Sequence, residues 1–113
     1  MSENKSKLFC ITNDLDLEPL GDGVSRQIML HDDEVMMVKV SFEKGAIGYE
    51  HDHPHRQISY IASGVFEVSI DKEKKVLKKG DAFYIPPNVK HGVVCLESGL
   101  LIDVFNPMRE DFI

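Results

Sequence analysis

The sequence has no excess of basic residues, and this absence narrows the range of partners. Its 13 lysines and arginines stand against 19 acidic residues, which gives a net charge of −6. A nucleic-acid-binding domain normally carries a basic stripe, so the composition argues against nucleic acid. No apolar run approaches membrane-spanning length, and the polar residues 1–7 lack the hydrophobic region of a signal peptide. We therefore expect a cytoplasmic protein that binds neither nucleic acid nor membrane.

Cysteine is also scarce. Only Cys10 and Cys95 occur, far apart in the sequence and each in apolar surroundings. Neither has the CxxC spacing of a redox or zinc site. We expect two buried free thiols in a reducing compartment rather than a disulfide.

Helical periodicity is the third feature that the sequence lacks. Apolar and polar residues alternate instead over short runs, most clearly in residues 35–42. Such runs recur about every 8–12 residues between turns rich in Gly, Pro, Asn and Asp, a spacing typical of an antiparallel sandwich or barrel. The sequence thus predicts an all-β fold of about eight to ten short strands. We expect one domain over residues 1–113, with residues 1–7 mobile.

Three local predictions accompany this fold class. Residues 8–11 form a short apolar run that we interpret as an edge strand. Residues 63–64 and 97–99 contain glycine and are interpreted as turns, each separating two strands.

Histidines are concentrated in one short stretch. His51, His53 and His55 lie two positions apart, and Gln57 follows at the same spacing. Alternate residues of an extended chain point to the same side, and a bend at Pro54 could gather several of these side chains around one point. Imidazole is the commonest metal ligand, and an amide oxygen can complete such a set. The alternative interpretation is that this histidine-rich stretch is a solvated polar loop that binds no metal.

Polar residues in the later apolar runs are the second part of the predicted site. His91 shares its parity with Val93 and Cys95, so it faces inward if they do. A lone inward histidine is usually a hydrogen-bonded core residue, but beside the first cluster we interpret it as a metal ligand. His31, in an acidic run, is interpreted as solvated.

Asp103 is the most unusual polar residue of these runs. It shares one face with Leu101 and Phe105, and a carboxylate buried there needs a partner, a metal or a reaction. The alternative is that this face is exposed to solvent. Arg109 lies just beyond Pro107, where its guanidinium could fork onto a carboxylate.

Together these residues resemble the cupin superfamily. Its first motif, Gly-x5-His-x-His-x3,4-Glu-x6-Gly, corresponds to Gly45, His51, His53, Gln57 and Gly64. Its second motif, Gly-x5-Pro-x-Gly-x2-His, corresponds to Gly80, Pro86, Asn88 and His91. Asn88 replaces a turn glycine, which asparagine can do because it tolerates left-handed backbone. Gln57 replaces the usual glutamate, which removes a negative charge and argues against a simple transfer of oxidase or dioxygenase activity.

A narrower resemblance, from about Gly45 onward, is to the KdgF-type pectin-degradation cupins. It rests on Gln-Ile-Ser-Tyr, Ile-Pro-Pro-Asn-Val-x-His-Gly and the ending Asp-Val-Phe-Asn-Pro-x-Arg-Glu-Asp-Phe. The resemblance implies ring opening of 4,5-unsaturated monouronates from pectin or alginate to linear 5-keto-4-deoxyuronate. It implies a divalent metal ion (zinc, nickel, iron, manganese or copper) on His51, His53, Gln57 and His91, with His55 as a possible substitute. It also implies that Asp103, Phe105 and Arg109 act on the substrate.

Two other functions remain open from the sequence. One is a different metal-cupin enzyme, a dioxygenase or a sugar isomerase, and the other is a non-catalytic cupin that binds a small acidic ligand. We also expect a homodimer, because the exposed edges of a small barrel must be covered and because this family commonly pairs. In that dimer, residues 8–11 would pair with the partner's sheet.

Overall fold

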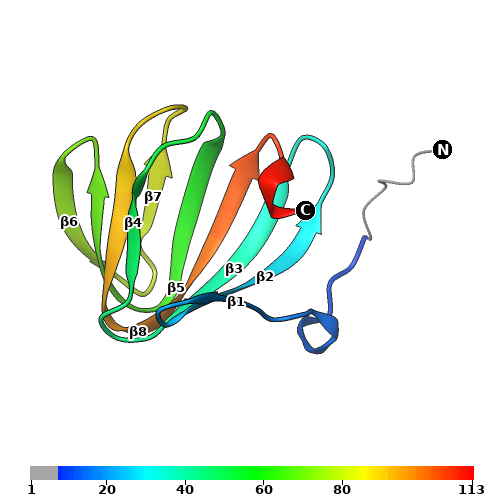
Figure 1. Cartoon of the computed structure of the whole chain (residues 1–113), viewed down its shortest axis with the longest axis horizontal. Helices are drawn as coiled ribbons and strands as arrows, with labels where there is room; N and C mark the ends of the chain where they lie inside the picture. The colour runs from blue at the N-terminus through cyan, green and yellow to red at the C-terminus, as the bar shows by residue number, and fades with distance from the viewer. Residues whose placement is uncertain (1–7) are drawn as a thin grey trace.

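A computed structural model describes residues 8–113, so the predicted mobile start, residues 1–7, lies outside the described residues (Figure 1). Eight strands, all paired antiparallel, make up the fold. They are β1 (Glu18–Gly21), β2 (Val24–His31), β3 (Met36–Phe42), β4 (Ile47–His51), β5 (Arg56–Ile70), β6 (Glu73–Lys78), β7 (Ala82–Ile85) and β8 (His91–Asn106). Two 3-10 turns, η1 (Thr12–Asp14) and η2 (Glu110–Phe112), complete the described part of the chain. The predicted all-β, antiparallel fold is confirmed.

Residues 8–113 contain no helix with the length and apolarity that crossing a membrane requires.

Two long strands, β5 and β8, connect the whole arrangement. The first half of β5 pairs with the second half of β8, so that Gln57 lies opposite Phe105. The second half of β5 pairs with the first half of β8, so that Ile70 lies opposite His91. Strands β3, β2 and β1 continue the sheet beyond one half of β8, and β4 pairs with its other half. The same two strands therefore run through both halves of the fold (Figure 1).

The predicted turns at residues 63–64 and 97–99 are wrong, because both segments lie within continuous strands. The pairing register of β5 and β8 shifts here, and Gly64 has a φ of +85°. A Cβ atom on Gly64 would lie 2.6 Å from the carbonyl oxygen of Glu97, and one on Gly99 would meet the backbone of Ser63. Glycine thus permits a close backbone crossing at which both strands bend without reversing.

The predicted edge strand at residues 8–11 is also wrong. This segment precedes η1 without pairing to the sheet, and the side chains of Leu8 and Phe9 are 79% and 82% exposed. The β1–β2 hairpin already occupies that edge of the sheet. Cys10 is consequently part-exposed rather than buried, whereas Cys95 is buried as expected. Both thiols are free, as predicted.

The core consists of two apolar clusters. The larger contains Phe42 and Phe66, whose rings meet edge to face with 5.3 Å between their centroids. The smaller contains Met36, Val38 and Phe105, and residues of the C-terminal segment pack against it. The C-terminal segment therefore forms part of the wall of the interior.

Candidate metal centre and adjoining cavity

Three histidines are brought together by β4, β8 and the loop that follows β4. Strand pairing places His51 opposite His91, at the end of β4 and the start of β8. His53 lies in the loop, and its carbonyl oxygen accepts a hydrogen bond of 2.8 Å from the backbone N–H of Asn88. Asn88 has a φ of +63°, so the predicted left-handed asparagine is confirmed. The turn before β8 thus holds the histidine loop in place.

The ring nitrogens of these histidines face one another. Ligand atoms of His51, His53 and His91 all lie within 4.8 Å of one another, a group that could hold a metal ion. Each Nδ1 lies 2.8–3.1 Å from a backbone carbonyl oxygen, to which its N–H donates. Such a bond fixes the tautomer and leaves the Nε2 lone pair free for a metal. The Nε2 atom of His91 is buried and has no hydrogen-bond partner.

Burial also favours the neutral form of two of these rings. Loss of solvation lowers the pKa of His91 to about 4 and lowers the pKa of His53 below its ordinary value. Neutral imidazole is the form that binds a metal, so the electrostatics suit the proposed ligand role.

Gln57, on β5, approaches the same point. Its Oε1 atom lies 3.0 Å from Nε2 of His53, and its Nε2–H group donates to the hydroxyl oxygen of Ser59 at 2.9 Å. A neutral His53 that carries its proton on Nδ1 presents only a lone pair to that oxygen. Two acceptors that face each other at this distance are best satisfied by a cation between them. Three imidazoles and an amide oxygen thus fit a divalent transition metal.

His55 does not join this group. Its backbone carbonyl accepts the hydrogen bond from Nδ1 of His53, and its Nδ1 atom is buried without a partner. Residues 52–55 belong to no strand and the chain bends at residues 54–55, so the alternating pattern fails at this position. The bend at Pro54 therefore brings His53 to the group and leaves His55 out.

Asp103 is buried, and the alternative of an exposed face is excluded. It lies on β8 between Leu101 and Phe105, and all three side chains face the interior. The hydroxyl of Ser59 donates a 2.6 Å hydrogen bond to its Oδ1 atom. Burial raises the pKa of Asp103 to about 6, although the Ser59 hydrogen bond opposes the rise. This carboxyl group can therefore gain or lose a proton near neutral pH.

Ser59 is a residue that the sequence analysis missed. It is fully buried and links Gln57 to Asp103, so a hydrogen-bonded chain runs from the histidine group to the carboxyl group. A signal was present in the sequence, because Ser59 shares its parity with Gln57 and Ile61, and all three face inward. A hydroxyl group on an inward face needs a partner.

Arg109 forks onto a carboxylate, as its position suggested, and that carboxylate belongs to Asp111. Its Nε and Nη2 atoms lie 3.0 and 2.8 Å from the two oxygens of Asp111. Its guanidinium carbon lies 5.1 Å from the ring centroid of Phe105 and 4.3 Å from that of Phe112. The C-terminal segment thus positions a cation beside Asp103.

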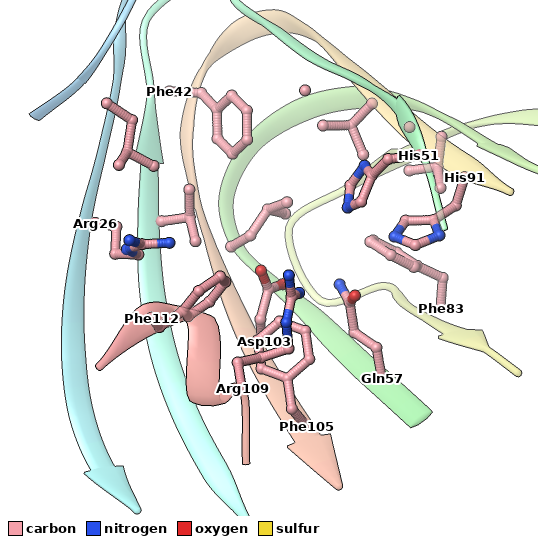
Figure 2. Close-up of a pocket in the computed structure, with 17 residues that line it drawn as sticks. Arg26, Phe42, His51, Gln57, Phe83, His91, Asp103, Phe105, Arg109 and Phe112 are labelled. Atoms are coloured by element: carbon pink, nitrogen blue, oxygen red, sulfur yellow. The ribbon is translucent and has the colours of Figure 1, made fainter. Parts of the chain in front are cut away.

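These residues surround one cavity of about 160 Å³ (Figure 2). One side, which we call the imidazole wall, consists of His51, His91 and Gln57, together with His53, which belongs to the same histidine group. The opposite side, which we call the arginine wall, consists of Arg26, Asp103, Phe105, Arg109 and Phe112. A small molecule in this cavity would meet the candidate metal ligands, a carboxyl group and guanidinium groups at once.

Comparison with known proteins agrees with this architecture. The cupin domain family matches residues 38–105. The chain is 50% identical over 107 residues to the pectin degradation protein KdgF of Dickeya dadantii, which covers 93% of this chain and 97% of that protein. A solved RmlC-like cupin from Shewanella frigidimarina superposes with a TM-score of 0.95 at 45% identity, covering 97% of this chain and 99% of that one. The solved KdgF from Halomonas sp. gives a TM-score of 0.91 at 40% identity, covering 95% and 99%. The predicted resemblance is confirmed.

Proposed function

Because the chain belongs to the cupin family and, within it, to the group of the KdgF pectin degradation protein, we propose that it opens the ring of 4,5-unsaturated monouronates. The substrates would come from pectin or alginate breakdown, and the product would be linear 5-keto-4-deoxyuronate. The observation that carries this proposal is a buried carboxyl group with a pKa of about 6 in a cavity that also meets the histidine group and Arg109. The two free cysteines fit the reducing cytoplasm as its location.

The metal in this proposal is one divalent ion bound by His51, His53, Gln57 and His91. Zinc, nickel, iron and manganese all accept such a nitrogen-rich donor set. Bound there, the ion would act as a Lewis acid that polarises a substrate oxygen. Since all four donors are neutral, the site would keep the ion's full positive charge available for an acidic sugar.

Asp103 is proposed to move the protons of the reaction, which is an isomerisation. The hemiacetal hydroxyl loses its proton, the bond between C1 and the ring oxygen breaks, and the ring oxygen takes up a proton, so that an aldehyde and an enol form. The enol then takes up a proton at C4 and loses its hydroxyl proton, which leaves the 5-keto group. A carboxyl group that is part-protonated near neutral pH suits both transfers, and its raised pKa gives Asp103 that property.

Arg109 and Phe105 are proposed to hold the sugar against Asp103. The guanidinium of Arg109 would bind the uronate carboxylate, because planar guanidinium and carboxylate groups match each other's hydrogen-bond geometry. The ring of Phe105 would pack against the sugar and exclude water from it. Both side chains are buried and line the cavity with Asp103, which supports these roles.

The test is turnover of a monouronate released by a pectin or alginate lyase. Loss of the ultraviolet absorbance of its double bond measures opening, and the rate must exceed that of the sugar alone. We expect acceleration without oxygen as well as with it, whereas a dioxygenase would need oxygen. Asp103→Ala should lower kcat by about 10²–10⁴-fold. Wild-type activity in this variant would remove the proposed role of Asp103, and no acceleration by the wild type would remove the proposed function.

We further propose that the protein is a homodimer. Ile58, Tyr60 and Tyr84 are 48–56% exposed on the outer face of β5 and β7, where Ile58 pairs with Tyr84. Such an apolar sheet face is typical of an interface, and residues 8–11, of which Leu8, Phe9 and Ile11 are exposed, would pair with the partner's sheet. Sedimentation equilibrium should give twice the chain mass at micromolar concentration. A monomer there would refute the dimer.

A further inference from the structure

Arg26 is a part-buried cation on the arginine wall to which the proposed reaction assigns no role. It lies on β2, its side chain is only 13% exposed, and it lines the cavity opposite the imidazole wall (Figure 2). Its Nε and Nη2 atoms donate to the two carboxylate oxygens of Glu18, on β1, at 3.0 and 3.1 Å. Glu18 therefore binds one edge of the guanidinium group, the edge that carries Nε and Nη2.

Arg109 is held in the same way. Asp111 accepts from its Nε and Nη2 atoms, and both guanidinium groups lie over the ring of Phe112. The guanidinium carbon of Arg26 lies 3.9 Å from that ring centroid, and that of Arg109 lies 4.3 Å from it. Figure 2 shows the ring of Phe112 between the two guanidinium groups. Each guanidinium group thus has its own carboxylate partner, and the two groups share the ring of Phe112.

This arrangement leaves the same part of each guanidinium for a ligand. Among residues 8–113, hydrogen bonds engage only the Nε and Nη2 atoms of Arg26 and Arg109, and neither Nη1 atom has a protein acceptor. Two positive charges at one ring also repel each other, because like charges at short distance are costly. Glu18 and Asp111 provide negative charge on the outer side, and on the inner side this wall carries the one carboxyl group of Asp103 against two guanidinium groups. An anion in the cavity would offset the remaining positive charge.

We propose that Arg26 and Arg109 form one carboxylate clamp and that Arg26 contacts the substrate directly. Arg26 is then a substrate-binding residue, and Glu18 is a positioning residue that acts through it. A uronate would direct its carboxylate to the arginine wall and its hydroxyl groups toward the imidazole wall. This inference rests on the proposed function in naming a uronate as the ligand and in assigning its carboxylate to Arg109. It predicts that the cavity distinguishes an acidic sugar from a neutral one mainly through these two arginines.

The decisive variant is Arg26→Gln, with Arg56→Gln as the matched control. Arg56 is exposed, carries the same charge and does not line the cavity. Loss of a hydrogen bond to a charged group should raise KM for the unsaturated uronate about 10- to 100-fold in Arg26→Gln, with kcat within about threefold. The KM of Arg26→Lys should lie between those of Arg26→Gln and the wild type, because lysine keeps the positive charge but lacks the paired hydrogen-bond donors of the guanidinium group.

Binding without turnover separates recognition from a merely structural role. Titration of the metal-loaded protein with galacturonate and with galactose gives the preference for the acidic sugar. Arg26→Gln should reduce this preference about tenfold or more, and Arg56→Gln should not change it. Glu18→Gln should raise KM about two- to fivefold alone and add nothing in the Arg26→Gln background. An unchanged preference in Arg26→Gln, even with a lower melting temperature, would overturn the inference.

These outcomes are independent of the proposed reaction. Turnover by the wild type with an unchanged KM in Arg26→Gln would leave ring opening in place and remove the clamp. Galacturonate binding that depends on Arg26, without any acceleration of ring opening, would support the proposed clamp and refute the proposed reaction.

Discussion

The two walls of the cavity are built from different kinds of contact. In the imidazole wall, backbone carbonyl oxygens fix the histidine rings, since each Nδ1 atom lies 2.8–3.1 Å from one of them. In the arginine wall, side-chain carboxylates fix the guanidinium groups of Arg26 and Arg109. The carboxylates belong to Glu18 and Asp111, and these two side chains are 50% and 60% exposed. One wall depends on the fold of the backbone and the other on ion pairs at the surface.

This difference matches what each wall has to do. A metal ion requires its donors at fixed distances and angles, and backbone hydrogen bonds provide that rigidity. A sugar acid is larger and can be held by longer side chains that adjust as it enters. We expect changes in the imidazole wall to abolish function and changes behind the arginine wall to weaken it gradually.

The largest effect is expected from His91→Ala. It removes one of the four donors, so metal affinity should fall by more than the 10- to 100-fold typical of an outer-shell change, and ring opening should fall to the uncatalysed rate. Metal content after dialysis measures the first effect. A bound metal stabilises the folded state, so the difference in melting temperature between loaded and chelated protein should disappear. His31→Ala is the control, and stoichiometric metal in His91→Ala would contradict the assignment.

The next effect concerns the close crossing at Gly64, where β5 and β8 bend. These two strands carry residues of both walls. Gly64→Ala places a Cβ atom 2.6 Å from a backbone oxygen at a φ of +85°. Gly80→Ala has a φ of +96° but open space around it, so comparing the two isolates the clash. Gly80→Ala should cost about 1–2 kcal/mol of unfolding free energy, and Gly64→Ala should cost at least about 2 kcal/mol more. Urea unfolding measures both, and equal losses would show that the crossing tolerates a methyl group.

Ser59→Ala tests whether the two walls are coupled. The substitution leaves the amide of Gln57 and the carboxyl of Asp103 without their shared partner, which should cost about 1–3 kcal/mol of stability. Metal affinity and kcat should both fall about tenfold, since both partners lose their orientation. Ser69→Ala, on the same strand, is the control. Loss of kcat with unchanged metal affinity would show that the walls act independently.

The sequence predicted the imidazole wall better than the arginine wall. Motif spacing identified His51, His53 and His91, and strand parity indicated that His91 faces inward. The pairing of β4 with β8 then places His51 opposite His91. Parity also placed Asp103 in the interior. Arg26 could not be found in this way, since its neighbours Glu18 and Phe112 come from a hairpin partner and from the far end of the chain. Glycine misled the analysis at residues 63–64, because a close crossing and a turn have the same sequence signal.

The smallest effect is expected from Asp111→Asn, which removes the charge behind Arg109. The Asp111 side chain is 60% exposed, and such ion pairs contribute about 0.2–1 kcal/mol, so KM should rise at most about fivefold with kcat unchanged. Glu110→Gln, at the neighbouring exposed position, should leave KM unaltered.

The pH dependence of this ion pair gives a second measurement. The hydrogen bond from Arg109 lowers the pKa of Asp111, so the pair stabilises the folded protein above the ordinary carboxyl range and is lost as the pH falls through the lowered pKa. The stability difference between wild type and Asp111→Asn should thus be constant from about pH 5 to 8 and vanish in stronger acid. Added salt should also reduce it, because exposed charges are screened. A KM effect as large as that of Arg26→Gln would instead mean that the exposed carboxylate binds substrate itself, and the contrast between the walls would fail.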